Sequence, residues 1–306
     1  NKNSNIVVEE FLKLEIEIQN HIGRVYTFVS LNETTNTTDQ ESAKYSVILQ
    51  KKFTEFTIIS ILFTKYLSAL EDIELLVNSS KFLKEHAFYI KEIIKSNKYK
   101  LDENTEGLLS KLNQSGSSLW SRLQGVLTST LEVEYKGEII TLPEILGKAE
   151  DSDPEVRKSA YLAELAAYPK IDKSIAFALN GIKGEVNTLS EKRGYSGALE
   201  RTLINSRLQE KTLNAMISAM KDYLPEFRKY LRRKGELLGS TTGLRWYDRN
   251  APIGKSSKEF SIEEAQAYVL KNFSTFSPHL KEVAEKAFTG NWVDYRPYKG
   301  KRGGAF

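Results

Sequence analysis

The sequence predicts a mostly α-helical protein: many helices, one β-hairpin and a short C-terminal strand. Apolar residues recur every three or four positions along much of the chain, which is the spacing of helices that bury one face. Capping residues and prolines stand where several helices are expected to begin. Alternating apolar residues, which predict strands, stand out at about 131–141.

Two long helices are predicted first. The stretch 31–42 is polar and rich in threonine, so we expect a loop there, with a second helix over about 43–76. Shorter helices are expected at about 81–96, 104–113 and 118–130. The apolar stripe of the first helix consists of Phe11, Leu14, Ile18, Ile22, Val25 and Val29.

A β-hairpin interrupts the helices. Val133 and Tyr135 alternate with charged residues before Lys136-Gly137, and Ile139 follows the pair. A glycine in a two-residue turn supplies the positive φ that a tight hairpin requires. We therefore place the hairpin at about 131–141.

Local signals mark the helices that follow the hairpin. Thr141 and Glu144 have the spacing of a capping box, and Asp153-Pro154 combines a side-chain cap with a proline in the first turn. Ser261 and Ser277 begin two more helices in the same manner. The expected helices between these starts cover about 154–168, 171–193 and 209–238, and the last two end at Gly194 and Gly239.

Composition excludes several classes of protein. The net charge of +4 over 306 residues is too small to indicate nucleic acid, so we expect no such partner. The apolar stretch 56–64 is shorter than the roughly 18–20 residues of a membrane-spanning helix, and no secretory signal opens the chain. Cysteine is absent, which excludes disulfides and suits the cytoplasmic location that we expect.

The chain shows no complete catalytic set. Its histidines are His21, His86 and His279, and no two of them stand four residues apart, the spacing of a zinc pair on a helix. The sequence also lacks a G-x-S-x-G elbow, a Walker loop and a dinucleotide glycine fingerprint.

Two stretches allow more than one interpretation. Residues 151–165 resemble one unit of a HEAT-type repeat, or else form a capped helix with Val156, Ala160 and Ala163 facing inward. The basic stretch 227–239 is either a nucleic-acid patch or, as we favour, the solvated face of a long helix.

Several motifs, in this order, resemble the oligoendopeptidase F family of zinc metallopeptidases, relatives of thimet oligopeptidase. The resemblance covers about residue 80 to the last residue, while residues 1–80 match only as generic helical sequence. The motifs are SSLWSRL (117–123), LEVEYKGEIITL (131–142), SDPEVRKSA (152–160), ALNGIKGEV (178–186), RGYSGALE (193–200), FRKYLRRKGELLG (227–239), WYDRNAPIG (246–254), SIEEAQAYVLKNFSTFSP (261–278), AFTGNW (287–292) and GKRGGAF (300–306).

The resemblance implies a helical peptidase with a deep substrate channel, whose zinc is bound by an H-E-x-x-H helix and a later glutamate. That motif is absent here, so no zinc ligand or catalytic residue is assigned to any position. The resemblance implies the N-terminal half of such an enzyme, inactive alone, with short peptides as substrates and the missing C-terminal catalytic half as partner. The regions expected are a helical one at 1–150 and the first part of the catalytic domain at 151–306.

One substrate-binding role is implied for the last four residues, Gly303, Gly304, Ala305 and Phe306. In the family, the strand that follows the glycines borders the channel, where its edge pairs with the backbone of a peptide. The alternative is that Gly303-Gly304 only forms a turn. Lys301 and Arg302 are either ligands for acidic groups of a substrate or a solvated pair.

A rival hypothesis is a non-enzymatic, helical-repeat-like interaction module, suggested by 151–165 and by the missing catalytic set. Under the peptidase hypothesis, the faces of the helices at 171–193 and 209–238 that meet the missing half are expected to be apolar and exposed.

Overall fold

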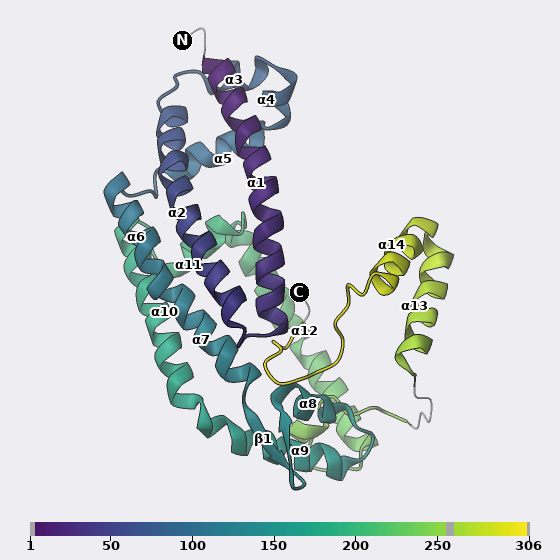
Figure 1. Ribbon diagram of the computed structural model, residues 1–306. Coiled ribbons are helices and arrows are strands. Elements are labelled where there is room, and N and C mark those ends of the chain that lie inside the picture. Colours follow the sequence, from purple (N-terminus) through teal and green to yellow (C-terminus); the bar gives the residue numbers. More distant parts are fainter. Residues whose placement is uncertain (1–3, 255–259, 305–306) are drawn as a thin grey trace. The chain divides into compact units, whose positions relative to one another are not determined.

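The computed structural model describes residues 4–254 and 260–304, and it is mostly helical (Figure 1). The predicted mostly α fold with one hairpin is confirmed. The chain divides into two compact units. The first unit is Asn1–Ser129, Pro169–Tyr223 and Gly304–Phe306, and the second unit is Thr130–Tyr168 and Leu224–Gly303. Residue 150 lies within the second unit, and the predicted division into a helical N-terminal region and a catalytic region stays a prediction.

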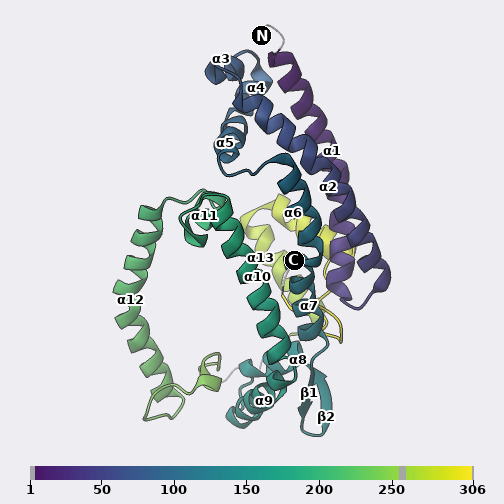
Figure 2. The same cartoon turned by 90° about the vertical axis from the view of Figure 1, so that its left-hand side faces the viewer.

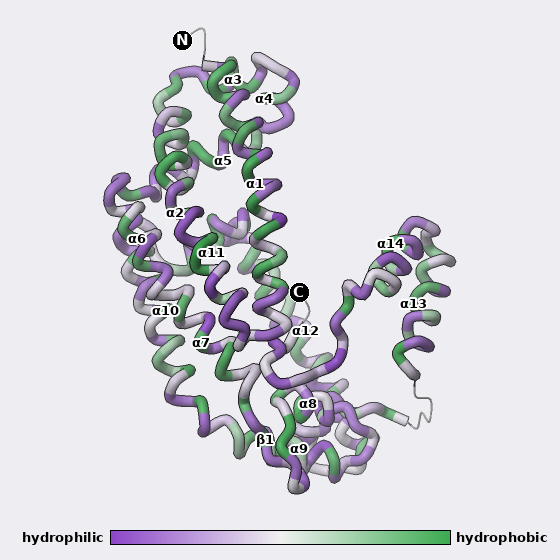
Figure 3. Tube along the Cα trace, viewed as in Figure 1, coloured by the Kyte–Doolittle hydropathy of each residue, from purple (hydrophilic) through white to green (hydrophobic). Residues whose placement is uncertain are grey.

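Two long helices, α1 (Ser4–Thr35) and α2 (Gln40–Ser68), pack side by side at the start of the first unit (Figure 1). Hydrophobic and hydrophilic stretches follow one another along both helices (Figure 3). The rings of Phe11 and Phe63 stack with centroids 3.7 Å apart. The buried cluster around this contact consists of Val8, Leu12, Phe63, Leu67, Leu76, Val77, Leu83 and Ile90.

The loop between these helices is shorter than the sequence predicts. Helix α1 continues to Thr35, and α2 begins at Gln40 with Asp39 as its N-cap. The prediction of a loop over 31–42 was wrong because polar side chains bond back to the helix. The Asn32 amide donates to the Phe28 carbonyl at 2.8 Å, and the Thr34 hydroxyl donates to the Ser30 carbonyl at 2.8 Å.

The helix predicted over 43–76 is also divided. The chain leaves α2 after Ser68 and starts α3 (Ile73–Asn78), where the Asp72 carboxylate accepts from the Leu75 N–H at 2.8 Å. The predicted helix at 81–96 is split at His86 into α4 (Lys81–Glu85) and α5 (Ala87–Asn97).

The rest of the first unit contains α6 (Glu103–Ser115), α7 (Ser117–Ser129), α10 (Asp172–Lys192) and α11 (Ala198–Asn205). Helix α10 packs along α7 (Figure 2). A Cβ added at Gly181 of α10 would lie 2.6 Å from the Trp120 indole nitrogen, so the close approach of the two helices requires glycine there. The Glu185 carboxylate accepts from the Ser117 N–H at 3.0 Å and so fixes the start of α7. Helix α11 was not predicted from the sequence.

The second unit begins with the predicted hairpin. Strands β1 (Glu132–Tyr135) and β2 (Glu138–Thr141) pair antiparallel, with Val133 opposite Ile140. Both turn residues have positive φ, 53° at Lys136 and 86° at Gly137, which is the two-residue turn that matches the twist of the strands.

The next helices are α8 (Leu142–Gly147) and α9 (Pro154–Ala167), followed in the second unit by α13 (Ile262–Phe276) and α14 (Pro278–Thr289), which pack against each other. The helix α12 (Glu210–Leu237) runs from the first unit into the second. Short 3-10 turns are η1 (Lys148–Glu150), η2 (Tyr168–Lys170) and η3 (Trp246–Asp248). The capping boxes at Thr141 and Ser261 and the caps at Asp153 and Ser277 are confirmed.

Replacing Gly137 with alanine is expected to lower the free energy of unfolding by roughly 1–2 kcal/mol, because a Cβ is strained at φ 86°. Urea denaturation of the two proteins measures the difference. The control is Gly147→Ala, at φ −61° with no atom within 4 Å of the added Cβ, which should be neutral or slightly stabilising. Equal losses in the two variants would contradict this account of the turn.

The predicted C-terminal strand is not formed over the described part of that segment. Residues 292–304 contain turns and bends, and Gly300 and Gly304 have φ of 89° and 124°, outside the range of a strand. A strand also requires a hydrogen-bonded neighbour, and the described sheet is β1-β2 alone. Ala305 and Phe306 lie outside the described residues. Within the described ranges, no helix has both the length and the apolar character needed to cross a bilayer.

Candidate functional site

The four predicted site residues are described only in part. Gly303 and Gly304 are exposed, and a Cβ at Gly303 would lie 3.7 Å from Pro143, an ordinary contact. At Gly304, φ of 124° favours glycine. Ala305 and Phe306 are outside the described residues. The peptide-binding role of this segment therefore stays a prediction.

The segment before these glycines is held by its own side chains. The Lys301 ammonium donates to the Asp294 carbonyl at 2.5 Å and to the Arg296 carbonyl at 2.9 Å, and it lies 3.2 Å from the Asp294 carboxylate. A hydrogen bond from Tyr298 lowers the pKa of Asp294. Lys299 pairs with Glu132 of β1 at 2.5 Å. The side chain of Lys301 is 17% exposed and makes its polar contacts within this loop, and its role toward a substrate stays a prediction.

The histidines do not converge. His86 Nδ1 lies 2.8 Å from the Phe82 carbonyl, and His279 lies 3.8 Å from Glu282 within α14. Across 4–254 and 260–304, no three His, Cys, Asp or Glu side chains form a group that could hold a metal ion. The described residues thus do not fit the zinc implied by the resemblance, and we assign no zinc role to them.

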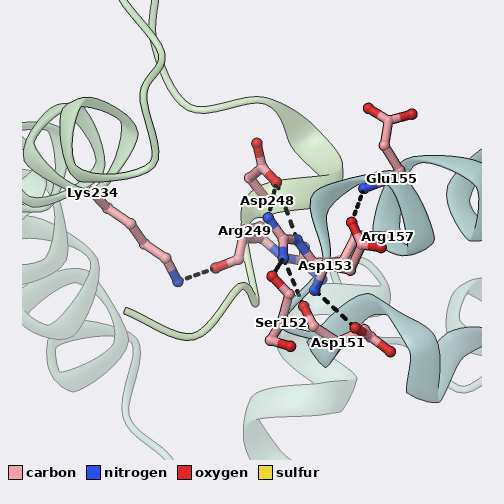
Figure 4. Close-up of polar contacts among 8 residues, drawn as sticks. All are labelled: Asp151, Ser152, Asp153, Glu155, Arg157, Lys234, Asp248 and Arg249. Carbon is pink, nitrogen blue, oxygen red and sulfur yellow. Dashed lines mark hydrogen bonds and ion pairs between the residues drawn. The ribbon is translucent and has the colours of Figure 1, made fainter. Parts of the chain in front are cut away.

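A buried ion pair lies in the second unit. Asp248 of η3 accepts from the Arg157 guanidinium of α9, at 2.7 Å from one terminal nitrogen and at 3.1 Å from Nε (Figure 4). The other terminal nitrogen donates to the carbonyls of Asp151 and Ser152, at 2.6 and 3.0 Å. Both charged side chains are 3% exposed. Such a pair is tolerated in the interior because nearly every donor has an acceptor.

Local hydrogen bonds hold the backbone whose carbonyls accept from Arg157. The N–H of Asp153 donates to the Asp151 carboxylate at 2.8 Å, and the Asp153 carboxylate caps α9 by accepting from the Glu155 N–H at 2.9 Å (Figure 4). On the other side of η3, the buried Lys234 donates to the Arg249 carbonyl at 2.7 Å. The network therefore ties the start of α9 and the end of α12 to the η3 loop.

Three of the sequence motifs meet in this network: 152–160, 227–239 and 246–254. A Cβ at Gly235 would lie 3.1 Å from the backbone of Gly243 and Leu244, so glycine permits the close approach between α12 and the chain that follows it. The interpretation of 151–165 as a capped helix agrees with buried Ala160. The basic side chains of the stretch 227–239 are exposed to solvent, except that of Lys234. The burial of Lys234 was not predicted from the sequence.

A second charged cluster lies in the first unit. The Arg193 guanidinium, at the C-cap of α10, donates to both oxygens of Glu106 in α6, at 2.5 and 2.7 Å, and to the Tyr99 carbonyl at 3.1 Å. Burial acts to raise the pKa of Glu106, but hydrogen bonds from Arg193 and the Leu101 N–H outweigh it, so the pKa lies below its usual range. The rings of Tyr99 and Tyr195 stack 4.0 Å apart beside this pair.

One face of α12 is apolar and exposed, as expected under the peptidase hypothesis. Tyr223 is 63% exposed and Phe227 is 60% exposed. On α10, Phe177 and Leu179 are also exposed. The residues that form the face of α12 recur every three or four positions and are Met216, Met220, Tyr223, Phe227, Tyr230 and Leu231.

Comparisons with known proteins find similarity to oligopeptidase F proteins. A family model described as oligopeptidase F matches residues 69–132. The oligopeptidase PepF of Bacillus subtilis is 24% identical over 97% of this chain, and the group B oligopeptidase PepB of Streptococcus agalactiae is 23% identical over 97%. The chain covers 46% and 51% of these two proteins, about half the length of the curated relatives that it matches.

A solved structure shows that the fold is shared. The crystal structure of oligoendopeptidase-F from Enterococcus faecium matches 95% of this chain and 62% of its own with a TM-score of 0.70 at 17% identity. At this identity the likeness concerns the fold alone. The family model, the curated relatives and the fold agree with one another, and the chain is similar to members of the oligoendopeptidase F family.

Proposed function

We propose that the chain is the N-terminal portion of a zinc metallo-oligoendopeptidase that hydrolyses short peptides in the cytoplasm. The observation that carries the proposal is the similarity to PepF along 97% of the chain, over about half the length of that oligopeptidase. The relatives found are peptidases, and the structure gives no support to the rival interaction module.

In this proposal, the helices of the chain form part of the wall of a substrate channel. The exposed apolar face of α12 supports a further segment packing on it, which we take to be the catalytic half that carries the zinc ligands. The region from Gly303 to Phe306 would continue as the strand whose edge pairs with the peptide backbone. The zinc ligands would lie outside this chain, and the residues described here would contribute shape and size limits rather than chemistry.

The activity of the complete gene product, compared with that of the 306-residue chain, tests the proposal. An internally quenched fluorescent short peptide is the substrate, and cleavage is followed with and without a metal chelator. We expect the complete product to cleave the peptide, to lose activity with the chelator and to regain it on addition of zinc. The 306-residue chain alone should cleave nothing and should bind no stoichiometric zinc.

Two outcomes would refute the proposal. One is chelator-sensitive hydrolysis by the 306-residue chain itself, because no metal-ligand set is formed by its described residues. The other is a complete gene product that is folded but cleaves no peptide in the presence of zinc.

A further inference from the structure

A pocket in the first unit combines apolar walls with an unbalanced positive charge. It lies between α1, α2, the start of α6 and the end of α10, and it has a volume of about 300 Å³. A space of this size suits a small molecule rather than a peptide. Three apolar and three charged residues line it: Phe53, Phe56, Ile61, Lys100, Glu106 and Arg193.

The charges of this pocket do not cancel. Glu106 has both carboxylate oxygens bonded to Arg193, and one of them also accepts from the Leu101 N–H at 3.0 Å. The Lys100 ammonium donates to the Thr64 hydroxyl at 2.8 Å. Within the described ranges, no carboxylate lies within 4.0 Å of it. Two cations and one anion therefore face the pocket.

Burying the charged ammonium of Lys100 costs free energy unless an anion lies beside it. Its side chain is half-buried, and burial lowers its pKa, while the charge of Glu106 acts in the opposite direction. The Thr64 hydroxyl, which already donates to the Ser60 carbonyl, supplies one neutral acceptor to a group that has three donors. An anion in the pocket would offset the cost of burying this charge.

The remaining wall residues indicate the chemistry of the rest of the ligand. Phe53, Phe56 and Ile61 present apolar surface from α2, and Ile61 is only 3% exposed. Gln19 and Ser60 add an amide and a hydroxyl that can donate to an anion. A bare inorganic anion would leave the apolar walls without a partner.

We propose that this pocket binds a small organic carboxylate with an apolar body, its carboxylate on Lys100 and its body against Phe53, Phe56 and Ile61. The site lies wholly within the first unit.

The test uses 3-phenylpropanoate as the probe and the 306-residue chain labelled at its isoleucine δ1 methyl groups. We expect saturable binding with a dissociation constant on the order of 1 mM or lower. The methyl of Ile61 should shift, and that of Ile139 on the hairpin should not. Neutral 3-phenylpropanamide, which has the same body without the charge, should bind at least about tenfold more weakly, as should inorganic phosphate.

The variant Lys100→Met removes the ammonium and retains the length of the side chain, and we expect it to weaken binding of the probe at least about tenfold. The matched control is Lys111→Met at an exposed lysine of α6, which should bind as the parent does. No saturable shift of Ile61, equal binding of the amide, or phosphate binding as tight as the carboxylate would each overturn the proposal. These comparisons use the parent chain, so they decide the matter even if the Lys100 variant does not fold.

Discussion

Replacing Asp248 with alanine is expected to lower the free energy of unfolding of the second unit by about 3–5 kcal/mol. The substitution leaves the Arg157 guanidinium buried with no carboxylate beside it, and both side chains are only 3% exposed. The carbonyls of Asp151 and Ser152 still accept from Arg157, but they supply no negative charge. Urea denaturation measures the loss, with the fluorescence of Trp246 in η3 as a local reporter.

The control for this experiment is Glu134→Ala, which removes an exposed carboxylate of β1 in the second unit and should change the stability by no more than about 0.5 kcal/mol. The paired replacement Arg157→Met with Asp248→Leu should lose less than Asp248→Ala alone, because no charge then remains buried. A loss for Asp248→Ala within the range of the control would contradict the account of the pair as a buried, mutually dependent unit.

Local chemistry explains which elements the sequence could predict. The hairpin follows from alternation around Lys136-Gly137, and the starts of α8, α9, α13 and α14 follow from caps that act over three residues. These signals are complete within a few neighbouring residues. Hairpins and helix starts that depend on such local signals can therefore be predicted from one sequence.

The errors arise where local signals conflict with packing. Apolar periodicity continues through residues 69–72, so the break between α2 and α3 was missed, although Asp72 is a capping residue. Threonine and asparagine usually favour loops, but those at the end of α1 bond to carbonyls of their own helix. The sequence alone does not show whether such a side chain will stabilise a loop or bond to a carbonyl of its own helix.

The charged networks could not be predicted from one sequence. Arg157 and Asp248 are 91 residues apart, Glu106 and Arg193 are 87 apart, and charged residues are exposed by default. The one available signal was the resemblance, whose motifs contain Arg157, Arg193 and Asp248. It identified important segments but not the partners within them.

Replacing Arg193 with methionine is expected to lower the free energy of unfolding of the first unit by about 3 kcal/mol at neutral pH, because Glu106 stays buried without its cation. The loss should depend on pH. In the parent chain the pKa of Glu106 is held below its ordinary value of 4.5, so its contribution is present above that pH and is lost as the pH falls through the lowered pKa. In the variant, burial remains without Arg193, so the pKa of Glu106 rises and protonation removes the unpaired charge.

The difference in stability between parent and variant should therefore shrink as the pH falls from 7 to about 3, in urea titrations at each pH. The control is Arg207→Met, which removes an arginine that is 62% exposed and pairs with Glu92 at 3.4 Å, and it should cost less than about 1 kcal/mol. If the loss from Arg193→Met were the same at both ends of this pH range, the arginine would act through its packing rather than its charge. The two contributions separate because protonating Glu106 removes the charge interaction and leaves the contacts of the arginine stem unchanged.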